Sequence, residues 1–585
     1  MYGFFKQLLT LDVSNRTSQA EALSETVLRA GLGGKGLGTQ LLLDRNPVGV
    51  DPFSADSHMV FAVGPATDSP IHGSCRHGIY AKSPLTGFYS ESYAGGSAAI
   101  AMSRVGFDAF VIKGASERPL WLEVSDQGVF FHSAEELWGL DTFETEAALR
   151  QKVAATAPGI LVIGPAGENR VRFAVIKNDG WRVCGRTGMG ALLGSKKIKA
   201  VVFHGSQKRP FADPDGLKSY ARQTLTDYKD HPVAQAYRNH GTPMMVDILN
   251  KAGGFPSRYW SQGSVEQCAD INAQSIKDRC RPKPRACRTC FLACAKSVQV
   301  QQGRHQGLKL EGPEYETIYA FGGLCMIDRI EEIVYLNDLC DRLGLDTMSS
   351  GNLAAFAIEA ARRGRIDLAI DYNQPDQIAA LLKKIVLRQG VGGLLADGIR
   401  PASEELGLEE IAVHVKGLEP SGYDPRVLKG MGLAYAVADR GACHLRTTFY
   451  KPELAGMIDP DQIDDKAALL IDFEDRCTLF DTLIVCRFYR DLYPWEEIGK
   501  LISLTTGEAY DQGELQALAA RVTDSARRFN LREGLRATDD WLPKRLLDQR
   551  LPDGRHIAAD DLRRLVNDYY RLRGWSIDGR LADAT

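Results

Sequence analysis

The sequence has little net charge, no long hydrophobic run and few cysteines, and each of these features excludes a class of protein. A formal net charge of -3 over 585 residues gives no overall attraction to nucleic acid or anionic membranes. No stretch reaches the roughly 18 apolar residues of a membrane-spanning helix, and the N-terminus lacks signal-peptide features. Twelve cysteines are too few for a disulfide scaffold of this length. We therefore expect a cytoplasmic protein that neither binds nucleic acid nor inserts into a membrane.

The length of the chain and its changes in local pattern indicate several domains, since a domain typically has roughly 100–200 residues. Short β-branched runs between glycine clusters fill residues 1–210 and predict strands. Beyond the breaker-rich segment 206–215, apolar residues recur at helical spacing, and a second breaker zone lies at 416–426. We expect an α+β fold with a β-rich domain at 1–210 and two mainly α-helical domains at 211–417 and 418–585.

Three glycine clusters, at 31–38, 86–99 and 185–203, divide the β-rich segment. The first satisfies G-x-G-x-x-G, but helical rather than strand periodicity precedes it, so the context of a dinucleotide-binding fold is missing. Tight turns in a sheet explain each cluster better. Together with Arg76, Arg182 and Arg186 the clusters suggest a flat anionic cofactor, because glycine exposes backbone N–H groups and arginine supplies bidentate charge. For any one of these arginines, a surface ion pair is the simpler explanation.

Three closely spaced cysteines, Cys287, Cys290 and Cys294, predict a metal site. Iron–sulfur clusters are held mostly by four thiolates, and the last often comes from a distant segment. A structural zinc site would normally show a second C-x2-C or an H-x3-5-H pair, and neither follows. Buried cysteines without a ligand are the remaining alternative. The spacing therefore favours an iron–sulfur cluster.

The helix predicted at 329–344 carries an acid in its last turn. Apolar residues at helical spacing run from Ile330 to Leu343, and Gly344 stands where a left-handed C-terminal residue belongs. At Asp341, the helix dipole disfavours a carboxylate by about 0.3–1 kcal/mol. The acid therefore needs a donor, which is either a heterocycle with paired N–H groups or a lysine or arginine.

These motifs together resemble the tungsten-containing aldehyde ferredoxin oxidoreductase family. The resemblance rests on the cysteine run, on DRLGLD at 341–346, on GPEYET at 312–317 and on the stretches 185–201 and 430–446. It extends along essentially the whole chain. In that family, one β-rich and two helical domains enclose tungsten held by two pyranopterin dithiolenes beside one 4Fe-4S cluster. The resemblance implies oxidation of aldehydes to carboxylic acids, with electrons leaving through the cluster to ferredoxin or a ferredoxin-like subunit.

The resemblance also implies roles for individual residues in holding the cofactors. The three clustered cysteines match cluster ligands, and the distant fourth ligand is Cys486. The first pterin motif, D-x-x-G-L-D, is intact in Asp341, Gly344, Leu345 and Asp346. In the second motif, D-x-x-G-L-C, Asp481 and Cys486 stay in register. There Ile484 and Val485 replace glycine and leucine, which we expect to alter the local freedom of the backbone.

Further residues match positions around the pterins and the substrate. Arg76 and Arg182 resemble arginines near the pterin phosphates and the cluster. The family's magnesium between the two phosphates is bound by backbone carbonyls, which fall here at about Tyr93 and Val183.

The resemblance implies that Glu316 acts as the general base and that His444 polarises or orients the aldehyde. Glu314, two residues away, is the alternative base.

Two other functions stay open at this point. Tungsten-dependent benzoyl-coenzyme A reductases of the same superfamily share the cofactor architecture but reduce an aromatic ring, and their catalytic subunit is typically longer. A non-catalytic electron-transfer subunit is the second alternative. The sequence does not distinguish tungsten from molybdenum, because pterin sulfurs hold the metal. It also identifies neither the aldehyde nor the oligomeric state, which could be a homo- or a hetero-oligomer.

Overall fold

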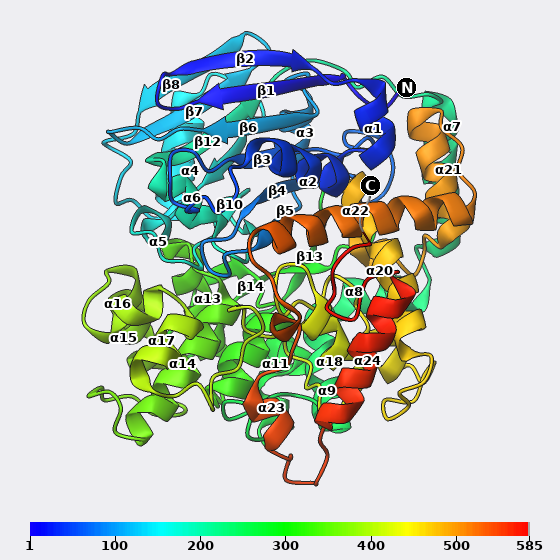
Figure 1. The fold of residues 1–585 in the computed structure, drawn as a ribbon. Helices are drawn as coiled ribbons and strands as arrows, with labels where there is room; N and C mark the ends of the chain where they lie inside the picture. Colours follow the sequence, from blue (N-terminus) through cyan, green and yellow to red (C-terminus); the bar gives the residue numbers. More distant parts are fainter. Residues whose placement is uncertain (583–585) are drawn as a thin grey trace. The chain divides into compact units, whose positions relative to one another are not determined.

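The computed structural model describes residues 1–582, and the chain folds into two compact units. Unit 1 comprises Met1–His231, Ala286–Phe291 and Asp475–Leu535. Unit 2 comprises Pro232–Arg285, Leu292–Glu474 and the residues from Arg536 on. The predicted α+β class is confirmed, because strands dominate the first 204 residues and helices dominate the rest (Figure 1). The division into three domains stays a prediction.

Unit 1 contains two six-stranded sheets. The first has the order β2-β1-β6-β3-β4-β5, formed by Thr17–Ala22, Gln7–Asp12, Ala109–Lys113, Met59–Ala62, His77–Lys82 and Tyr89–Ala94. The second has the order β11-β10-β9-β12-β7-β8, formed by Arg182–Cys184, Ile176–Asn178, Gly159–Val162, Ile198–His204, Leu120–Ser125 and Gly128–Ser133. Neighbouring strands are antiparallel except in the pairs β1/β6 and β12/β7.

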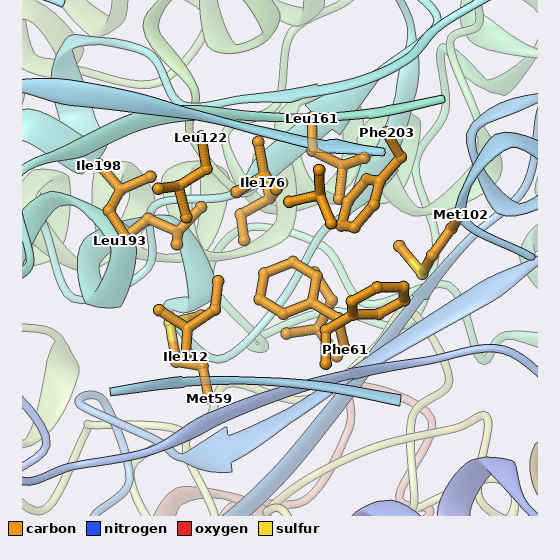
Figure 2. Packing of buried hydrophobic residues seen from close by; sticks show 14 of the residues in the cluster. Met59, Phe61, Met102, Ile112, Leu122, Leu161, Ile176, Leu193, Ile198 and Phe203 are labelled. Atoms are coloured by element: carbon orange, nitrogen blue, oxygen red, sulfur yellow. The ribbon is translucent and has the colours of Figure 1, made fainter. Parts of the chain in front are cut away.

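The two sheets of unit 1 share one hydrophobic core. Figure 2 shows Met59 and Phe61 of the first sheet on one side of this core, with Leu161 and Phe203 of the second sheet on the other. The opposite face of β3 is buried as well, because Val60 packs in a second cluster with helices. Burial on both faces explains why these strands are continuously apolar in sequence rather than alternating.

The glycine cluster at 31–38 forms the junction between α1 (Glu25–Gly31) and α2 (Gly34–Arg45), so the prediction of tight turns in a sheet is wrong there. A Cβ at Gly36 would lie 2.2 Å from the carbonyl oxygen of Gly31, and one at Gly38 would lie 2.4 Å from the ring of Tyr80. The glycines are therefore required for close packing of a helix. In sequence such glycines look the same as those required by turns.

Helices from two distant parts of the chain complete unit 1. A segment late in the sequence supplies α22 (Gln512–Arg532), which contacts α2. The remaining helices of this unit are α3 (Ala98–Ser103), α4 (Thr142–Lys152), α5 (Pro165–Glu168), α6 (Met189–Ser195), α7 (Pro214–Tyr228) and α21 (Trp495–Thr506), with a 3-10 turn at Arg487–Tyr489. Helix α20 (Lys466–Leu483) begins in unit 2 and ends in unit 1.

Unit 2 is mainly helical and contains a small antiparallel sheet, β13-β14-β15, formed by Lys283–Arg285, Ala295–Gln299 and Lys309–Glu311. Helices predicted from apolar spacing form α13 (Ile330–Leu343), α14 (Thr347–Arg362) and α15 (Pro375–Val386). The other helices are α8 (Pro232–His240), α9 (Met245–Ala252), α10 (Cys268–Ile271), α11 (Ala273–Cys280), α12 (Tyr315–Ile318), α16 (Val391–Ala396), α17 (Ile399–Leu406), α18 (Lys429–Val437), α19 (Tyr450–Leu454), α23 (Lys544–Asp548) and α24 (Ala559–Leu572). Among the helices of residues 1–582, none combines the length and apolar character that crossing a bilayer requires.

Candidate active site and cysteine site

The first predicted pterin motif, residues 341–346, lies at the C-terminal end of helix α13. The helix ends at Leu343, and Gly344 takes the left-handed conformation with φ 78°. The backbone N–H of Leu345 then donates to the carbonyl oxygen of Cys340 at 2.9 Å. This bond closes a Schellman-type turn, as the sequence predicts for a helix that ends in glycine.

The second motif follows the same backbone route without the glycine. Helix α20 ends at Leu483, Ile484 has φ 51°, and the N–H of Val485 donates to the carbonyl oxygen of Phe480 at 2.8 Å. The turn therefore keeps its left-handed residue although isoleucine replaces glycine, and the expected change in backbone freedom stays a prediction. The left-handed conformation costs a residue with a Cβ roughly 1–2 kcal/mol. Burial of Ile484, which is 1% exposed, offsets this cost.

The motif acids are held by donors close to them in sequence. The side-chain amide of Asn337 donates to Asp341 at 2.8 Å, which is a donor that neither sequence alternative named. Asp346 caps helix α14 by accepting the backbone N–H of Met348 at 3.0 Å. In unit 1, Asp481 forms an ion pair with Arg487. Each carboxylate therefore has a fixed orientation at the end of its helix.

Unit 1 brings Cys287, Cys290 and Cys486 close to a further thiol, Cys75, that the sequence analysis missed. Cys75 is buried and hydrogen-bonded to Cys287, and the pKa of Cys75 is raised by that bond, by burial and by the charges of the other two cysteines. The only signal in the sequence is its position next to Arg76. Cys294, the remaining predicted ligand, follows Cys290 in the chain but belongs to unit 2.

The predicted arginines lie beside Cys287. The hydrogen bond from Cys75, followed by the charges of Arg182 and Arg76, holds the pKa of the Cys287 thiol below its usual value. A guanidinium nitrogen of Arg76 also donates to the carbonyl oxygen of Tyr93 at 3.2 Å. Because the thiolate is the form that binds metals, this electropositive environment suits a ligand cysteine.

The two predicted magnesium-binding carbonyls lie on neighbouring strands of unit 1. Tyr93 is in β5 and Val183 is in β11, and these strands contact each other. The position of Tyr93 is further fixed by its hydroxyl, which donates to the buried Glu91 at 2.5 Å.

Aromatic and polar groups surround Cys290 and Cys486. The hydroxyl of Tyr489 donates to the sulfur of Cys290 at 3.2 Å, and the ring of Phe291 lies edge-on to the Tyr489 ring. The backbone N–H of Cys486 donates to the carbonyl oxygen of Gly73 at 3.0 Å. Hydrogen bonds to sulfur and exclusion of water are the features that tune iron–sulfur clusters, so the residues present fit such a group.

Within residues 1–582, no three cysteine, histidine or acidic side chains converge as ligands of a single ion. In a cluster each cysteine binds a different iron atom, so the sulfurs do not need to converge on one point.

Unit 2 brings the predicted acid–base pair together. Glu316, in α12, accepts the backbone N–H of Gly422 through Oε2 at 3.0 Å. Its Oε1 lies 3.5 Å from Nε2 of His444, and the two side chains are 17% and 13% exposed. The other ring nitrogen of His444, Nδ1, is 2.5 Å from the hydroxyl oxygen of Ser421. The pair is therefore oriented from both sides while it stays accessible.

Buried tyrosines fix the segment that faces this pair. Tyr315 donates its hydroxyl to the carbonyl oxygen of Gly422, and Tyr319 donates to that of Pro420 at 2.7 Å. Burial raises the pKa of Tyr315 well above its usual value, so the hydroxyl remains a donor. Tyr319 begins a π-helical turn, Tyr319–Leu324, and such turns are frequent at functional sites.

The alternative base, Glu314, has different surroundings. Its side chain is exposed, and its carboxylate accepts the hydroxyl of Thr242. The same hydroxyl oxygen accepts the backbone N–H of Tyr315 at 2.9 Å. The geometry therefore favours Glu316 over Glu314 as the partner of His444.

Comparisons with known proteins cover almost the whole chain. The family model described as "Aldehyde ferredoxin oxidoreductase, N-terminal domain" matches residues 8–205, and that described as "Aldehyde ferredoxin oxidoreductase, domains 2 & 3" matches 219–585. The protein is thus an oxidoreductase. It is 33% identical to the tungsten-containing aldehyde ferredoxin oxidoreductase of Pyrococcus furiosus over 99% of this chain and 98% of that protein. The corresponding protein of Thermococcus kodakarensis gives the same identity and coverage. The chain belongs to the aldehyde ferredoxin oxidoreductase family, as the sequence motifs indicated, and membership implies a tungsten pterin cofactor.

Two further similarities are more distant. A Pyrococcus furiosus protein named aliphatic sulfonate oxidoreductase, WOR-like subunit, is 29% identical over 76% of this chain and 76% of that protein. The solved active-site complex BamBC of benzoyl coenzyme A reductase with 1,5 dienoyl-CoA has a TM-score of 0.85 and covers 99% of this chain and 96% of that chain. At 22% identity, the latter likeness shows a shared fold.

Proposed function

We propose that this enzyme oxidises aldehydes to carboxylic acids and passes the electrons through a 4Fe-4S cluster to a ferredoxin or a ferredoxin-like protein. The observation that carries the proposal is the oriented pair of Glu316 and His444. Likeness over the full length to aldehyde ferredoxin oxidoreductases supplies the substrate class. The proposed acceptor likewise follows from the names of these relatives.

The residues that would hold the cofactors fall into three sets. The cluster would be held by Cys287, Cys290, Cys294 and Cys486. The two pterins would be bound at the motif residues Asp341, Gly344, Leu345, Asp346 and Asp481. The pterin phosphates and their magnesium would be bound by Arg76, Arg182 and the carbonyls of Tyr93 and Val183. When bound, the metal pterin supplies a two-electron redox centre and the cluster supplies a one-electron relay.

The reaction requires a proton acceptor that the chain itself provides. Conversion of an aldehyde to an acid takes up the oxygen of one water and releases two protons and two electrons. The carboxylate of Glu316 accepts a proton released in this way. When Nδ1 of His444 accepts the Ser421 hydroxyl, its Nε2 carries the ring proton and can donate to the aldehyde oxygen or to Glu316.

Metal content and substrate range test the proposal directly. Purified protein is analysed for tungsten, molybdenum and iron, and then assayed with aldehydes and a viologen dye. A cyclic dienoyl-coenzyme A and an aliphatic sulfonate serve as competing substrates. We expect tungsten or molybdenum at about one per chain and dye reduction with aldehydes. Iron without tungsten or molybdenum would indicate an electron-transfer subunit. Activity with a competing substrate but not with aldehydes would show that the proposed substrate class is wrong.

Glu316→Gln tests the proposed base. The amide cannot accept the proton, so we expect turnover to fall by about 10²–10⁴-fold with unchanged tungsten and iron content. Glu314→Gln is the matched control, because it makes the same change two residues away on an exposed side chain. Near-normal activity of Glu316→Gln, or a larger loss in the control, would remove Glu316 from the role.

Cys486→Ala tests the fourth cluster ligand. We expect the variant to lose or degrade the cluster signal in electron paramagnetic resonance, because one iron lacks its thiolate. Cys477→Ala, which changes a buried cysteine of α20 outside the ligand set, is the control and should keep the signal. An unchanged spectrum in Cys486→Ala contradicts the assignment.

A further inference from the structure

We propose that Lys296 is a positioning residue that holds a fixed positive charge beside Cys294 and favours the reduced state of the cluster bound there. The inference rests on the proposed function only in requiring a cluster at Cys294. It concerns a residue outside the cysteine, pterin and acid–base sets.

The ammonium group of Lys296 is bound entirely by backbone carbonyls. Its Nζ donates to the carbonyl oxygens of Tyr237 at 2.8 Å, Cys294 at 2.9 Å and Ala293 at 3.1 Å, and it lies 3.4 Å from that of Ala295. An ammonium group has three protons, so the three short bonds use all of them. The residue is 5% exposed, which places the charge inside unit 2 rather than at its surface.

Within the described residues 1–582, no acidic side chain forms an ion pair with Lys296, and the charge of Glu314 acts on the ammonium group from a greater distance. A buried ammonium without a counter-charge is costly, even when dipoles satisfy its protons. Tyr237 is in helix α8, close to its C-terminal end, where the negative end of the helix dipole compensates part of the charge. The negative charge of the Cys294 thiolate acts on Lys296 more strongly than that of Glu314, and a cluster bound at Cys294 would add to it.

The surrounding chain is shaped to keep this arrangement. Gly241, just after helix α8, has φ 65°, and a Cβ there would lie 2.7 Å from the carbonyl oxygen of Cys294 and 3.4 Å from Nζ of Lys296. Its own N–H donates to the carbonyl oxygen of Tyr237 at 2.9 Å. A residue with a side chain at position 241 would therefore displace the cysteine segment or the ammonium group.

The electrostatic consequence follows from the location of the charge. Because Nζ is hydrogen-bonded to the carbonyl of Cys294, the charge stays within a few ångströms of a cluster ligand, and burial limits its screening by salt. Reduction adds an electron to the cluster, and a nearby positive charge stabilises the more negative state. If Lys296 only held the segment of Cys294 in place, a neutral hydrogen-bond donor could replace it without changing the reduction potential of the cluster.

Redox titration of the holoenzyme, followed by electron paramagnetic resonance, tests the inference. The variants are Lys296→Gln, which keeps donors but removes the charge, Lys296→Met, which removes both, and Lys296→Arg, which keeps the charge. Lys196→Met is the matched control, since Lys196 is also buried and donates to carbonyls, at 2.6 Å to Ser57 and 3.2 Å to Gly114, and none of these residues is a proposed ligand. Iron content is measured for every variant.

We expect the ratio of reduced to oxidised cluster at a fixed potential to fall about tenfold in both neutral variants, which equals about 59 mV for a one-electron couple. Lys296→Arg and Lys196→Met should stay near the wild type. Loss of iron in the two neutral variants, with retention in Lys296→Arg, also supports a required charge. Three results would overturn the inference. The first is an unchanged cluster potential in Lys296→Gln, and the second is a shift in Lys296→Arg or Lys196→Met equal to that in the neutral variants. The third is loss of iron in all three Lys296 variants. Wild-type protein without iron would refute the cluster itself, and this inference with it.

Discussion

Replacement of Ile484 should remove the usual advantage in stability of an alanine variant over a glycine variant. In most buried positions alanine is tolerated better than glycine, because glycine loses more backbone entropy on folding, at a cost of about 0.5–1 kcal/mol. Ile484 is different because its φ is 51°. The left-handed conformation penalises alanine and isoleucine alike but not glycine.

The expected magnitudes follow from burial and conformation. Truncation of a buried isoleucine to alanine costs about 2–5 kcal/mol, and Ile484 is 1% exposed within the core cluster of α2 and α22. Ile484→Gly loses one more methyl group, but it recovers about 1–2 kcal/mol of conformational strain. Glycine's entropy cost of about 0.5–1 kcal/mol and the lost methyl group, worth about 0.8 kcal/mol, offset this gain, so we expect Ile484→Gly and Ile484→Ala to be about equally stable.

Ile79 provides the matched control for this comparison. It is fully buried in β4, where the backbone is extended, so Ile79→Ala should be more stable than Ile79→Gly. Denaturant midpoints from tryptophan fluorescence are compared as pairs at each position, because a chain of two units does not guarantee two-state unfolding. A difference in midpoint between Ile484→Ala and Ile484→Gly as large as that of the Ile79 pair would refute the argument from strain.

Three other changes give further tests. Tyr489→Phe removes the hydroxyl that donates to Cys290, so the cluster should be harder to reduce in a redox titration at unchanged iron content. Burial lowers the pKa of His77 from its ordinary value of about 6.5 to about 4. Stability that is present above about pH 6.5 is therefore lost as the pH falls toward 4, by up to about 3 kcal/mol. His77→Gln should therefore show a smaller fall in Tm on acidification than the wild type. Ser421→Ala removes the partner of Nδ1 of His444 and should lower kcat about five- to thirtyfold, as expected for about 1–2 kcal/mol, with tungsten content unchanged.

The sequence predicts individual strands and helices of this fold better than it predicts which of them pack together. The apolar runs at 59–64 and 108–114 form β3 and β6, and helical spacing at 329–344 forms α13. The pairing of β6 between β1 and β3 depends on contacts between distant segments, which local patterns do not encode. For the same reason, breaker-rich segments do not reveal that the segment Asp475–Leu535 packs into unit 1.

Candidate site residues could be named from the sequence where they belong to a recognisable motif. The pair of Glu316 and His444 lies together as predicted, although the two residues are far apart in the chain. Cys75 and Ser421 carry no such signal, because each is a single residue whose neighbours would look the same in an ordinary loop. At Ile484, in contrast, the sequence shows a departure from the motif that does not change the turn. A lost glycine suggests a changed turn, but burial of the replacing side chain stabilises the original one.

In unit 2, Lys296 also connects the segment of Cys294 to the segment of Glu316. The carbonyl oxygen of Lys296 accepts the backbone N–H of Gly312 at 2.8 Å, and Gly312 begins the stretch that leads into α12. A displaced cysteine segment would therefore also shift Glu316 and change the KM for the aldehyde. Loss of charge alone would leave that geometry in place. A Lys296→Gln enzyme with a lowered cluster potential and an unchanged KM would thus separate an electrostatic role of Lys296 from a purely structural one.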